Sequence, residues 1–375
     1  MQYKTGQQDS AATNRGPGTH PGFLRGGFGA ALKLLFRART FRQIPRLLHE
    51  GPKPLFRLAI QMHNTAEIMR LLREGRQVIF VSSFPRSGNT WVRYLLADVF
   101  LQNRGVETAT ELPVHPDKIV PDFYCHWIAR RDVSIPTPGV FVKLHETFPQ
   151  LQARFGGALP QPGVADTGAA APPFPRCKHI FLYRSPEDAL VSLFHYHQRD
   201  KQLKAGTAAG IDEFCLAALP GWEENLAGYL RAAEEGFPVL FIPYELLLQY
   251  PAEILGNLLR WLGARHEATT VERAVSNMQF SKLQAVEARS LFNEEAAFFR
   301  QGCKGSGRAE LQPSTVDIIQ EKTASLLEQA NARVLIQQSL PGYPATSKTA
   351  QIRWRAAFHN RPSQILPTVA KLQKI

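Results

Sequence analysis

Residues 84–91 combine side chains and backbone features that suit the binding of an anion. Arg86 carries a permanent positive charge, Gly88 lets the backbone approach a ligand closely, and Thr90 offers a hydroxyl. The segment follows the apolar run 78–81 and precedes apolar residues at helical spacing. A loop in that place lies at a helix N-terminus, where unpaired N–H groups and the positive end of the helix dipole favour a negative ligand. Phosphate, sulfate or a nucleotide is therefore expected there.

The P-loop of nucleoside triphosphatases, G-x-x-x-x-G-K-[ST], is the first comparison, and it does not match. Asn89 stands where that loop has its lysine, and the loop contains no acidic residue that could help to hold Mg²⁺. The segment instead resembles the 5′-phosphosulfate loop of the sulfotransferase family, Y/F-P-K/R-S-G-x-T-W. That family uses the sulfate donor 3′-phosphoadenylyl sulfate (PAPS). The resemblance implies that the donor is bound by Arg86, Ser87, Gly88, Asn89, Thr90 and Trp91.

Lys143 and His145 follow each other at the end of the apolar run 139–144. Residues two apart in a strand point to the same face, and the chemistry of open α/β sheets gathers at the carboxyl ends of strands. The pair resembles the K-T-H motif of sulfotransferases. The resemblance implies that His145 is the general base and that Lys143 contacts the transferring sulfuryl group. A purely structural histidine is the alternative.

Arg184 and Ser192 belong to a third cluster, Tyr-Arg-Ser-Pro-Glu-Asp-Ala-Leu-Val-Ser, at residues 183–192. An arginine after an apolar run can bind a phosphate with two N–H groups, and Ser192 lies about two helical turns further on. The cluster resembles the family's 3′-phosphate motif, R-x-P-x-D-x-x-V-S, so both residues are expected to bind the 3′-phosphate of the donor. An arginine that caps a neighbouring carbonyl group is the alternative.

Aromatic residues are expected to form the adenine pocket. Tyr244 lies in a segment that resembles the family's Y-E-D-L-x-x-x-P, and it would line the pocket with Trp91 and Phe280. Aromatic rings suit a flat base, because stacking needs no match of hydrogen bonds. Core packing explains each of the three rings equally well.

A last match lies at residues 299–305, which resemble the R-K-G-x-x-G loop that closes over the 3′-phosphate. It adds Arg300, Gln301 and Gly302 to the expected donor-binding residues. The family's usual Asp-Trp after the second glycine is replaced here by Ser306-Gly307, and its middle lysine is replaced by Gln301.

Short apolar strands alternate with helical patterns along the chain, which predicts an α/β fold. It is expected to be a three-layer sandwich with a central parallel sheet and a P-loop-like phosphosulfate-binding loop. Strands are predicted at 78–81, 139–144, 179–183 and 239–242. Helices are predicted at 55–73, 91–99, 186–197, 222–236, 251–262, 269–275 and 314–340.

Composition divides the chain into four parts. Residues 1–22 are rich in Gly, Ser, Thr, Gln and Pro and are predicted to be disordered. Residues 23–76 form a basic helical extension, 77–327 form the domain that carries the motifs, and 328–375 form a basic C-terminal extension. Within the domain, the Gly- and Pro-rich stretch at about 151–176 predicts a flexible insertion, either a lid or disordered.

The net charge of +12 comes from the two ends of the chain. Fourteen bases lie between Asp9 and Glu50 or after Glu328, in stretches without an acid, and subtracting them from +12 leaves −2 for the body. No specific nucleic acid is expected, because the bases lie outside the motifs. Residues 24–39 and the C-terminal tail could contact an anionic membrane surface, since apolar residues of 24–39 share one helical face. An accessory helix docked on the body is the alternative.

Cys125, Cys177, Cys215 and Cys303 are scattered, which argues against a disulfide framework and a zinc site, and no metal is expected. No secretory signal and no apolar run long enough to span a membrane are found. These patterns predict a cytoplasmic protein, with membrane association as an option, and they are compatible with a homodimer.

The resemblance implies in-line, metal-independent transfer of a sulfuryl group from PAPS to a hydroxyl or amine, with His145, Lys143 and Arg86 as catalytic residues. Two alternatives stay open: an ATP-dependent P-loop kinase, and a non-catalytic nucleotide-fold protein that binds membrane or polyanions through its basic ends. The acceptor could be a lipid, a glycan, a small phenol or alcohol, or a peptide. The basic ends favour a lipophilic acceptor slightly.

Overall fold

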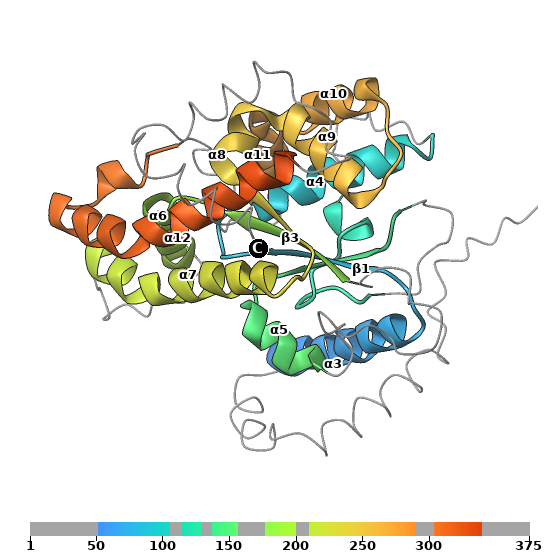
Figure 1. Ribbon diagram of the computed structural model, residues 1–375, viewed down its shortest axis with the longest axis horizontal. Helices are drawn as coiled ribbons and strands as arrows, with labels where there is room; N and C mark the ends of the chain where they lie inside the picture. Colours follow the sequence, from blue (N-terminus) through green and yellow to red (C-terminus); the bar gives the residue numbers. More distant parts are fainter. Residues whose placement is uncertain are drawn as a thin grey trace, which may run out of the picture. The chain divides into compact units, whose positions relative to one another are not determined.

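A four-stranded parallel sheet in the order β2-β1-β3-β4 lies at the centre of the computed structural model (Figure 1). The model describes residues 52–105, 115–128, 137–156, 177–199, 210–289 and 304–339. The strands are β1 (Val78–Ser83), β2 (Val140–Leu144), β3 (Cys177–Tyr183) and β4 (Val239–Pro243). All four strands were predicted from their apolar runs, and the predicted parallel sheet is confirmed.

Helices pack on both faces of this sheet, which is why its strands are apolar along nearly their whole length. On one face, the ring of Phe80 lies 5.7 Å from that of Phe155 in α5 (Phe148–Phe155). On the opposite face, Ile79 and Val81 pack in one core cluster with Leu95 of α4 (Asn89–Gln102). The α/β class and the layered arrangement are therefore as predicted.

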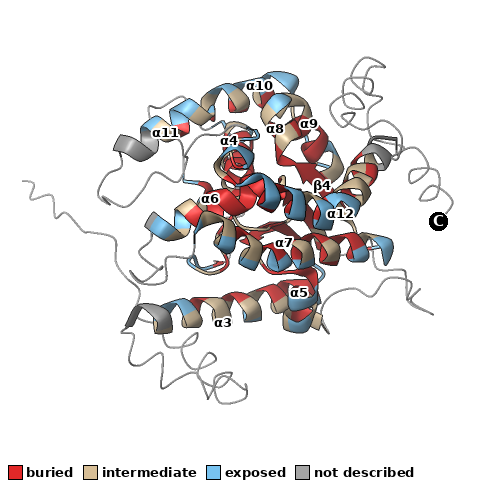
Figure 2. Cartoon of the chain, turned by 90° about the vertical axis from the view of Figure 1, so that its left-hand side faces the viewer, coloured by how far each residue is buried: buried red, intermediate tan, exposed pale blue. Residues whose placement is uncertain are grey.

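The structure describes eight further helices. They are α3 (Pro52–Arg73), α6 (Pro186–Arg199), α7 (Ile211–Glu234), α8 (Tyr244–Gln249), α9 (Pro251–Leu262), α10 (Ala268–Asn277), α11 (Phe280–Arg289) and α12 (Pro313–Ser339). Figure 2 shows that α6, which packs against α7 and α12, is largely buried. This burial matters because the first turns of α6 carry part of the predicted phosphate site.

Both edges of the sheet are covered by polar contacts. At β4, Gln337 of α12 accepts the N–H of Phe241 (3.3 Å) and donates to the carbonyl of Val239 (2.7 Å). At β2, Lys143 donates its backbone N–H to Pro121 (2.9 Å). Such contacts satisfy backbone groups that an edge strand would otherwise expose.

Four helices differ from the sequence expectation. Helix α7 begins at Ile211, not at residue 222, because Pro220 and Gly221 do not break it. Its early turns bury Cys215 and Leu219, and this burial outweighs the missing hydrogen bond at the proline. The short helices α5, α8 and α11 were not predicted as helices from the sequence.

The predicted insertion at 151–176 is wrong in its first part. Residues up to Phe155 belong to α5, where Leu151 and Phe155 are fully buried in the core. A capping box at Thr147 and Gln150 starts this helix. Residues 157–176 lie outside the described residues, as do the predicted disordered start, the segment 24–39 and the tail beyond 339. The domain boundaries stay predictions.

No helix in the described ranges is long and apolar enough to cross a membrane.

Candidate active site

The loop between β1 and α4 turns through two left-handed residues. Arg86 has φ 68°, the only positive φ of a non-glycine residue in the described chain, and Gly88 has φ 93°. Strained backbone of this kind costs about 1–3 kcal/mol and persists where the surrounding structure holds it, which is common at ligand sites. Alternating backbone handedness also aims N–H groups into a concavity that suits an anion. The loop therefore has the local geometry that its sequence predicted.

Gly88 is required by its neighbour as well as by its φ angle. A Cβ atom added here would meet Cδ2 of Tyr244 at 2.6 Å. Only a glycine allows the loop backbone to lie against this ring. Beside it, the hydroxyl of Ser87 is fully buried and has no hydrogen-bond partner among the residues that the structure describes. A close-fitting backbone and an unsatisfied buried hydroxyl both fit a site built for a polar ligand.

Arg86 reaches from the loop to α6. Its Nε atom donates a hydrogen bond to Oγ of Ser192 (3.1 Å), and its guanidinium carbon lies 5.4 Å from the ring centre of Tyr196, one turn further along the helix. The loop at residues 84–91 and the cluster at residues 183–192 are thereby brought together by one side chain.

Arg184 follows β3 and lies below the same loop. Its guanidinium carbon is 4.6 Å from the ring centre of Tyr244, its Nη1 donates to the carbonyl of Arg86 (3.4 Å), and its Nη2 is 3.8 Å from Oδ2 of Asp188. The side chain is 9% exposed. A buried guanidinium held on three sides by ring, carbonyl and carboxylate is well ordered before any ligand arrives.

Asp188 connects Arg184 to the end of the segment at residues 299–305 and to the residues after it. Its two carboxylate oxygens accept the backbone N–H groups of Gly305 (2.8 Å) and Gly307 (2.7 Å). A Cβ at Gly307 would meet the carbonyl oxygen of Glu187 at 2.4 Å, so this segment lies directly on the start of α6. The predicted ligands Arg300, Gln301 and Gly302 lie outside the described residues, but the chain that follows them is anchored beside Arg184.

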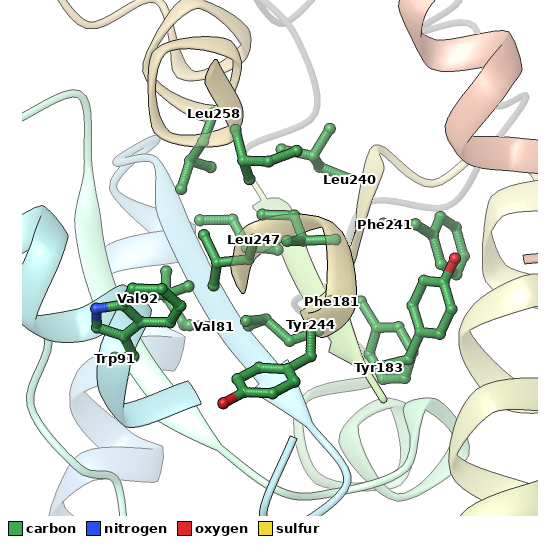
Figure 3. Close-up of a cluster of buried hydrophobic side chains, with 14 of the residues drawn as sticks. Val81, Trp91, Val92, Phe181, Tyr183, Leu240, Phe241, Tyr244, Leu247 and Leu258 are labelled. Carbon is green, nitrogen blue, oxygen red and sulfur yellow. The ribbon is translucent and has the colours of Figure 1, made fainter. Parts of the chain in front are cut away.

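The aromatic residues Trp91 and Tyr244 meet edge to face, with ring centres 6.5 Å apart (Figure 3). Nε1 of Trp91 donates to the carbonyl of Met278 (2.8 Å), two residues before the half-buried Phe280. Because Trp91 and Tyr244 are 6% and 5% exposed, most of their surface serves the core. They can offer an adenine ring only an edge or a small part of one face.

Glu245 connects the segment that contains Tyr244 to the cluster at residues 183–192. Its Oε1 accepts the backbone N–H of Ser185 (2.9 Å), directly after Arg184. Burial raises the pKa of this carboxyl above its ordinary value. The sequence indicated Glu245 only as part of a motif, and its structural role is to fix the turn that presents Arg184.

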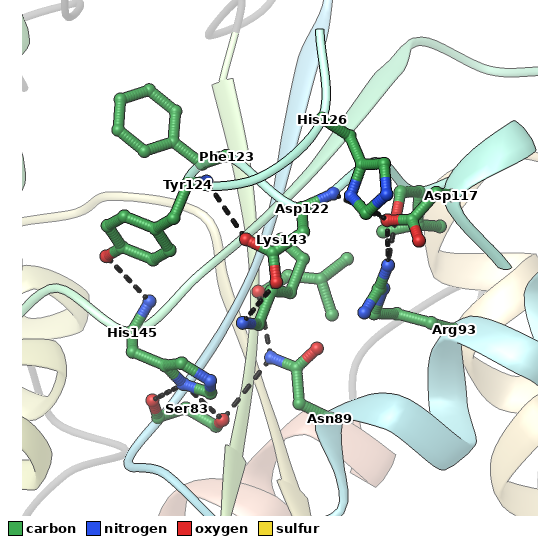
Figure 4. Close-up of polar contacts among 12 residues, drawn as sticks. Ser83, Asn89, Arg93, Asp117, Asp122, Phe123, Tyr124, His126, Lys143 and His145 are labelled. Atoms are coloured by element: carbon green, nitrogen blue, oxygen red, sulfur yellow. Dashed lines mark hydrogen bonds and ion pairs between the residues drawn. The ribbon is translucent and has the colours of Figure 1, made fainter. Parts of the chain in front are cut away.

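His145 lies directly after β2, opposite the end of β1 (Figure 4). Its Nδ1 is 2.9 Å from the carbonyl oxygen of Ser83. Since a carbonyl oxygen only accepts, Nδ1 carries the proton and Nε2 keeps its lone pair. Burial, and then the charge of Lys143, lower the pKa of His145 to about 3. The imidazole is therefore neutral at physiological pH, in the tautomer that can take a proton at Nε2.

Asn89 supports this histidine indirectly. Its Nδ2 donates to the carbonyl of Val81 (3.0 Å) and to Oγ of Ser83 (3.3 Å), and Oγ of Ser83 is in turn 3.3 Å from Nδ1 of His145. Both amide hydrogens of Asn89 are thus used within the protein, and its side chain faces β1. Thr90, the second residue of α4, is half-buried.

Lys143 forms a contact that no motif predicted. Its Nζ is 2.7 Å from Oδ2 of Asp122, and the ring centre of Tyr124 lies 5.6 Å from it. Asp122 and Tyr124 come about twenty residues earlier in a segment without regular structure, so nothing in the local sequence pattern pointed to them. Among the described residues, no group of three His, Cys, Asp or Glu side chains could hold a metal ion.

Comparisons with known proteins give consistent similarities. A family model described as the sulfotransferase domain matches residues 76–331. Cytosolic sulfotransferase 13 of Arabidopsis thaliana is 27% identical over 268 residues, which cover 66% of this chain and 76% of that protein. Flavonol 3-sulfotransferase of Flaveria bidentis is 24% identical over 259 residues, covering 60% and 74%. Among solved structures, a mouse sulfotransferase complexed with PAP aligns over 80% of this chain and 95% of that chain, with 18% identity and a TM-score of 0.46.

Proposed function

This chain belongs to the sulfotransferase family, whose model matches residues 76–331, and from that membership we propose how its site residues share the reaction. It is an enzyme that transfers a sulfuryl group from PAPS to an acceptor. The observation that carries the assignment of roles is the hydrogen bond between Arg86 and Ser192, because it joins the predicted 5′-phosphosulfate loop to the predicted 3′-phosphate motif.

The loop at residues 86–91 binds the 5′ end of the donor. Arg86 supplies charge, the backbone next to Gly88 supplies N–H groups, and the hydroxyls of the buried Ser87 and the half-buried Thr90 supply further donors. Asn89 is given a different role from its neighbours. Its side-chain amide is already used by Val81 and Ser83, so its backbone N–H is proposed as its contact to the donor. The fit of this set to a phosphosulfate rests on the close backbone at Gly88 and the unsatisfied hydroxyl of Ser87.

The 3′-phosphate is proposed to bind at Arg184 and Ser192, and Arg300, Gln301 and Gly302 are proposed as further ligands from their motif alone. Support comes from Asp188, which lies beside Arg184 and anchors the backbone of Gly305 and Gly307 after that loop. The adenine ring is placed at the edges of Tyr244, Trp91 and Phe280.

The acceptor loses its proton to Nε2 of His145 as its oxygen or nitrogen forms a bond to sulfur. The bond between sulfur and the bridging oxygen breaks in the same in-line step, and the nucleotide leaves as 3′-phosphoadenosine 5′-phosphate (PAP). Arg86 and Lys143 stabilise the charge that develops on the sulfuryl and leaving oxygens. Since a guanidinium is not deprotonated in proteins, Arg86 acts by its charge and not as a proton donor.

Transfer is proposed to need no metal ion, because the side chains of Arg86 and Lys143 already provide two positive charges for the reacting groups. For the acceptor we propose a lipophilic hydroxyl compound such as a phenol. Its support is the similarity to a relative named for flavonols.

A cytoplasmic location is proposed in the same way, from relatives named as cytosolic. Membrane contact of residues 24–39 and a homodimer stay predictions.

Titration calorimetry with PAP, with and without Mg²⁺, tests this function together with transfer of radiolabelled sulfate from PAPS to a flavonol and to a lipid extract. Tight binding of PAP without Mg²⁺ and labelling of an acceptor are expected. A requirement for Mg²⁺ with transfer from ATP would indicate a kinase instead. PAP binding without labelling of any acceptor would indicate a non-catalytic nucleotide-binding protein.

A further inference from the structure

A short segment at residues 121–124 runs along the outer edge of β2 beside Lys143. The backbone N–H of Lys143 donates to the carbonyl of Pro121 (2.9 Å), and the N–H of Phe123 donates to the carbonyl of Lys143 (3.0 Å). Asp122 and Lys143 thereby form a parallel bridge outside the named strands. The segment fixes the backbone of the residue that is expected to contact the sulfuryl group.

The side chains of the same two residues are joined as well. Oδ2 of Asp122 lies 2.7 Å from Nζ of Lys143, and the two side chains are 16% and 10% exposed. Burial by itself would raise the pKa of Asp122, but the charge of Lys143 and its hydrogen bond hold that pKa below its ordinary value. Asp122 is therefore an ionised carboxylate that holds the end of a long, otherwise flexible side chain.

Tyr124 reaches the second member of the Lys-x-His pair. Its hydroxyl oxygen accepts the backbone N–H of His145 (3.3 Å), and its ring lies near the Lys143 ammonium (Figure 4). The backbone N–H of Tyr124 donates to Oδ1 of Asp122 (2.9 Å), which fixes the two residues relative to each other. One segment therefore contacts both Lys143 and His145.

The segment is held in turn by contacts with Arg93 of α4. Nε of the buried Arg93 donates to the carbonyl of Val120 (3.0 Å), and its guanidinium forms an ion pair with Asp117. Oδ1 of Asp117 accepts the backbone N–H of Asp122 (2.8 Å). The segment that contacts Lys143 is thus connected to α4, the helix that begins at the donor loop.

We propose that Asp122 and Tyr124 are positioning residues for sulfuryl transfer: Asp122 holds the Lys143 ammonium at the sulfuryl group, and Tyr124 holds the backbone of His145. An ammonium has three N–H donors, and the bond to Asp122 uses one, which leaves two for sulfuryl oxygens. Ordering this side chain before the reaction removes an entropic cost from the transition state. The inference rests on the proposed function of Lys143 and His145.

The direction in which Asp122→Asn changes kcat distinguishes a positioning role from a purely electrostatic effect of the carboxylate. A carboxylate near a developing negative charge is unfavourable, so Asp122→Asn should speed transfer if only its charge mattered. If Asp122 positions Lys143, the same substitution should lower kcat by about tenfold or more. The dissociation constant of PAP should stay within about twofold and the melting temperature should change little, because the change is nearly isosteric. Asp317→Asn, an exposed carboxylate on α12, is the matched control and should leave all three quantities unchanged.

The experiment is a double-mutant cycle of Asp122→Asn and Lys143→Ala, with labelled PAPS and the acceptor found for the wild-type protein. The double variant should be no slower than Lys143→Ala alone, since Asp122 acts through Lys143. Tyr124→Phe, which removes only the hydroxyl, should lower kcat several-fold without changing the PAP dissociation constant.

Three results would overturn the inference: equal or faster transfer by Asp122→Asn, losses that add fully in the double variant, or a parallel loss of PAP binding and melting temperature. A wild-type protein that binds no PAP or transfers no sulfate would instead overturn the proposed function itself, and this inference with it.

Discussion

Nδ1 of His145 donates a hydrogen bond to the carbonyl oxygen of Ser83, 2.9 Å away at the end of the neighbouring strand. The contact decides which ring nitrogen is available, because the accepting carbonyl fixes the tautomer. A histidine that is neutral and presents Nε2 is prepared to act as a base without any rearrangement of the ring.

Replacing His145 by alanine should therefore remove proton transfer and little else. Turnover is expected to fall by about 10² to 10⁴, the usual contribution of a general base. The dissociation constant of PAP, measured by calorimetry, should change little, because no phosphate contact is assigned to this residue. An equal loss of turnover and PAP binding would contradict the assignment.

The pH dependence of turnover should lack the usual histidine limb. Because the pKa of His145 is lowered to about 3, first by burial and then by Lys143, the base stays neutral as pH falls. The value of kcat/KM should be nearly constant from about pH 8 to about pH 5, where an ordinary histidine would be mostly protonated. Lys143→Ala removes one cause of the lowered pKa and should move the acid limb upward. A limb near pH 6.5 in the wild-type protein would contradict this account.

The burial of His179 should make the free energy of unfolding depend on pH in the acid range. It is fully buried beside Phe80, with ring centres 5.2 Å apart, and burial lowers its pKa to about 3. The unfolded chain therefore binds more protons than the folded chain between about pH 6.5 and 3, so the free energy of unfolding should decrease as pH falls through that window, by up to about 1.4 kcal/mol per pH unit. His179→Leu should flatten this slope in denaturant titrations at several pH values. An unchanged slope would show that His179 is not its source.

Position 88 should tolerate only glycine. In Gly88→Ala the new Cβ would lie 2.6 Å from the Tyr244 ring at φ +93°, so a loss of about 1–3 kcal/mol in stability and at least about tenfold weaker PAP binding are expected. Gly263→Ala is the matched control, since Gly263 has φ +73° but nothing within 4 Å of its Cβ. The Gly263→Ala variant should lose stability only because of its left-handed φ angle, and its affinity for PAP should not change. Equal effects of both substitutions on PAP binding would contradict a close-fitting loop.

Arg184→Ala should distinguish the two ends of the nucleotide. A lost charge-assisted contact is worth about 1.5–3 kcal/mol, which predicts roughly 10- to 150-fold weaker binding of PAP. Binding of AMP, which lacks the 3′-phosphate, should change far less. Calorimetry with both nucleotides measures the difference, and similar losses for the two would place the 3′-phosphate elsewhere.

The sequence predicted the sheet and most of the site because their signals are local. Apolar runs marked all four strands, and Arg86, Arg184 and His145 lie in short motifs directly after three of them. Helix α5 was missed although Phe148, Leu151 and Phe155 recur at helical spacing, because its eight residues adjoin a Gly- and Pro-rich stretch and were assigned with it to one loop. Asp122 could not be found in this way. Its partner is 21 residues away, and only folding brings the two together.

The end of β1 positions both the base and the start of the donor-binding helix. Ser83 accepts a hydrogen bond from Nδ1 of His145 at its carbonyl oxygen and one from the Asn89 amide at its hydroxyl oxygen. The base and the first residue of the donor helix are therefore held by the same backbone position. The spacing between the atom that takes the proton and the loop that holds the sulfate is then a property of strand register, which can change only in whole-residue steps.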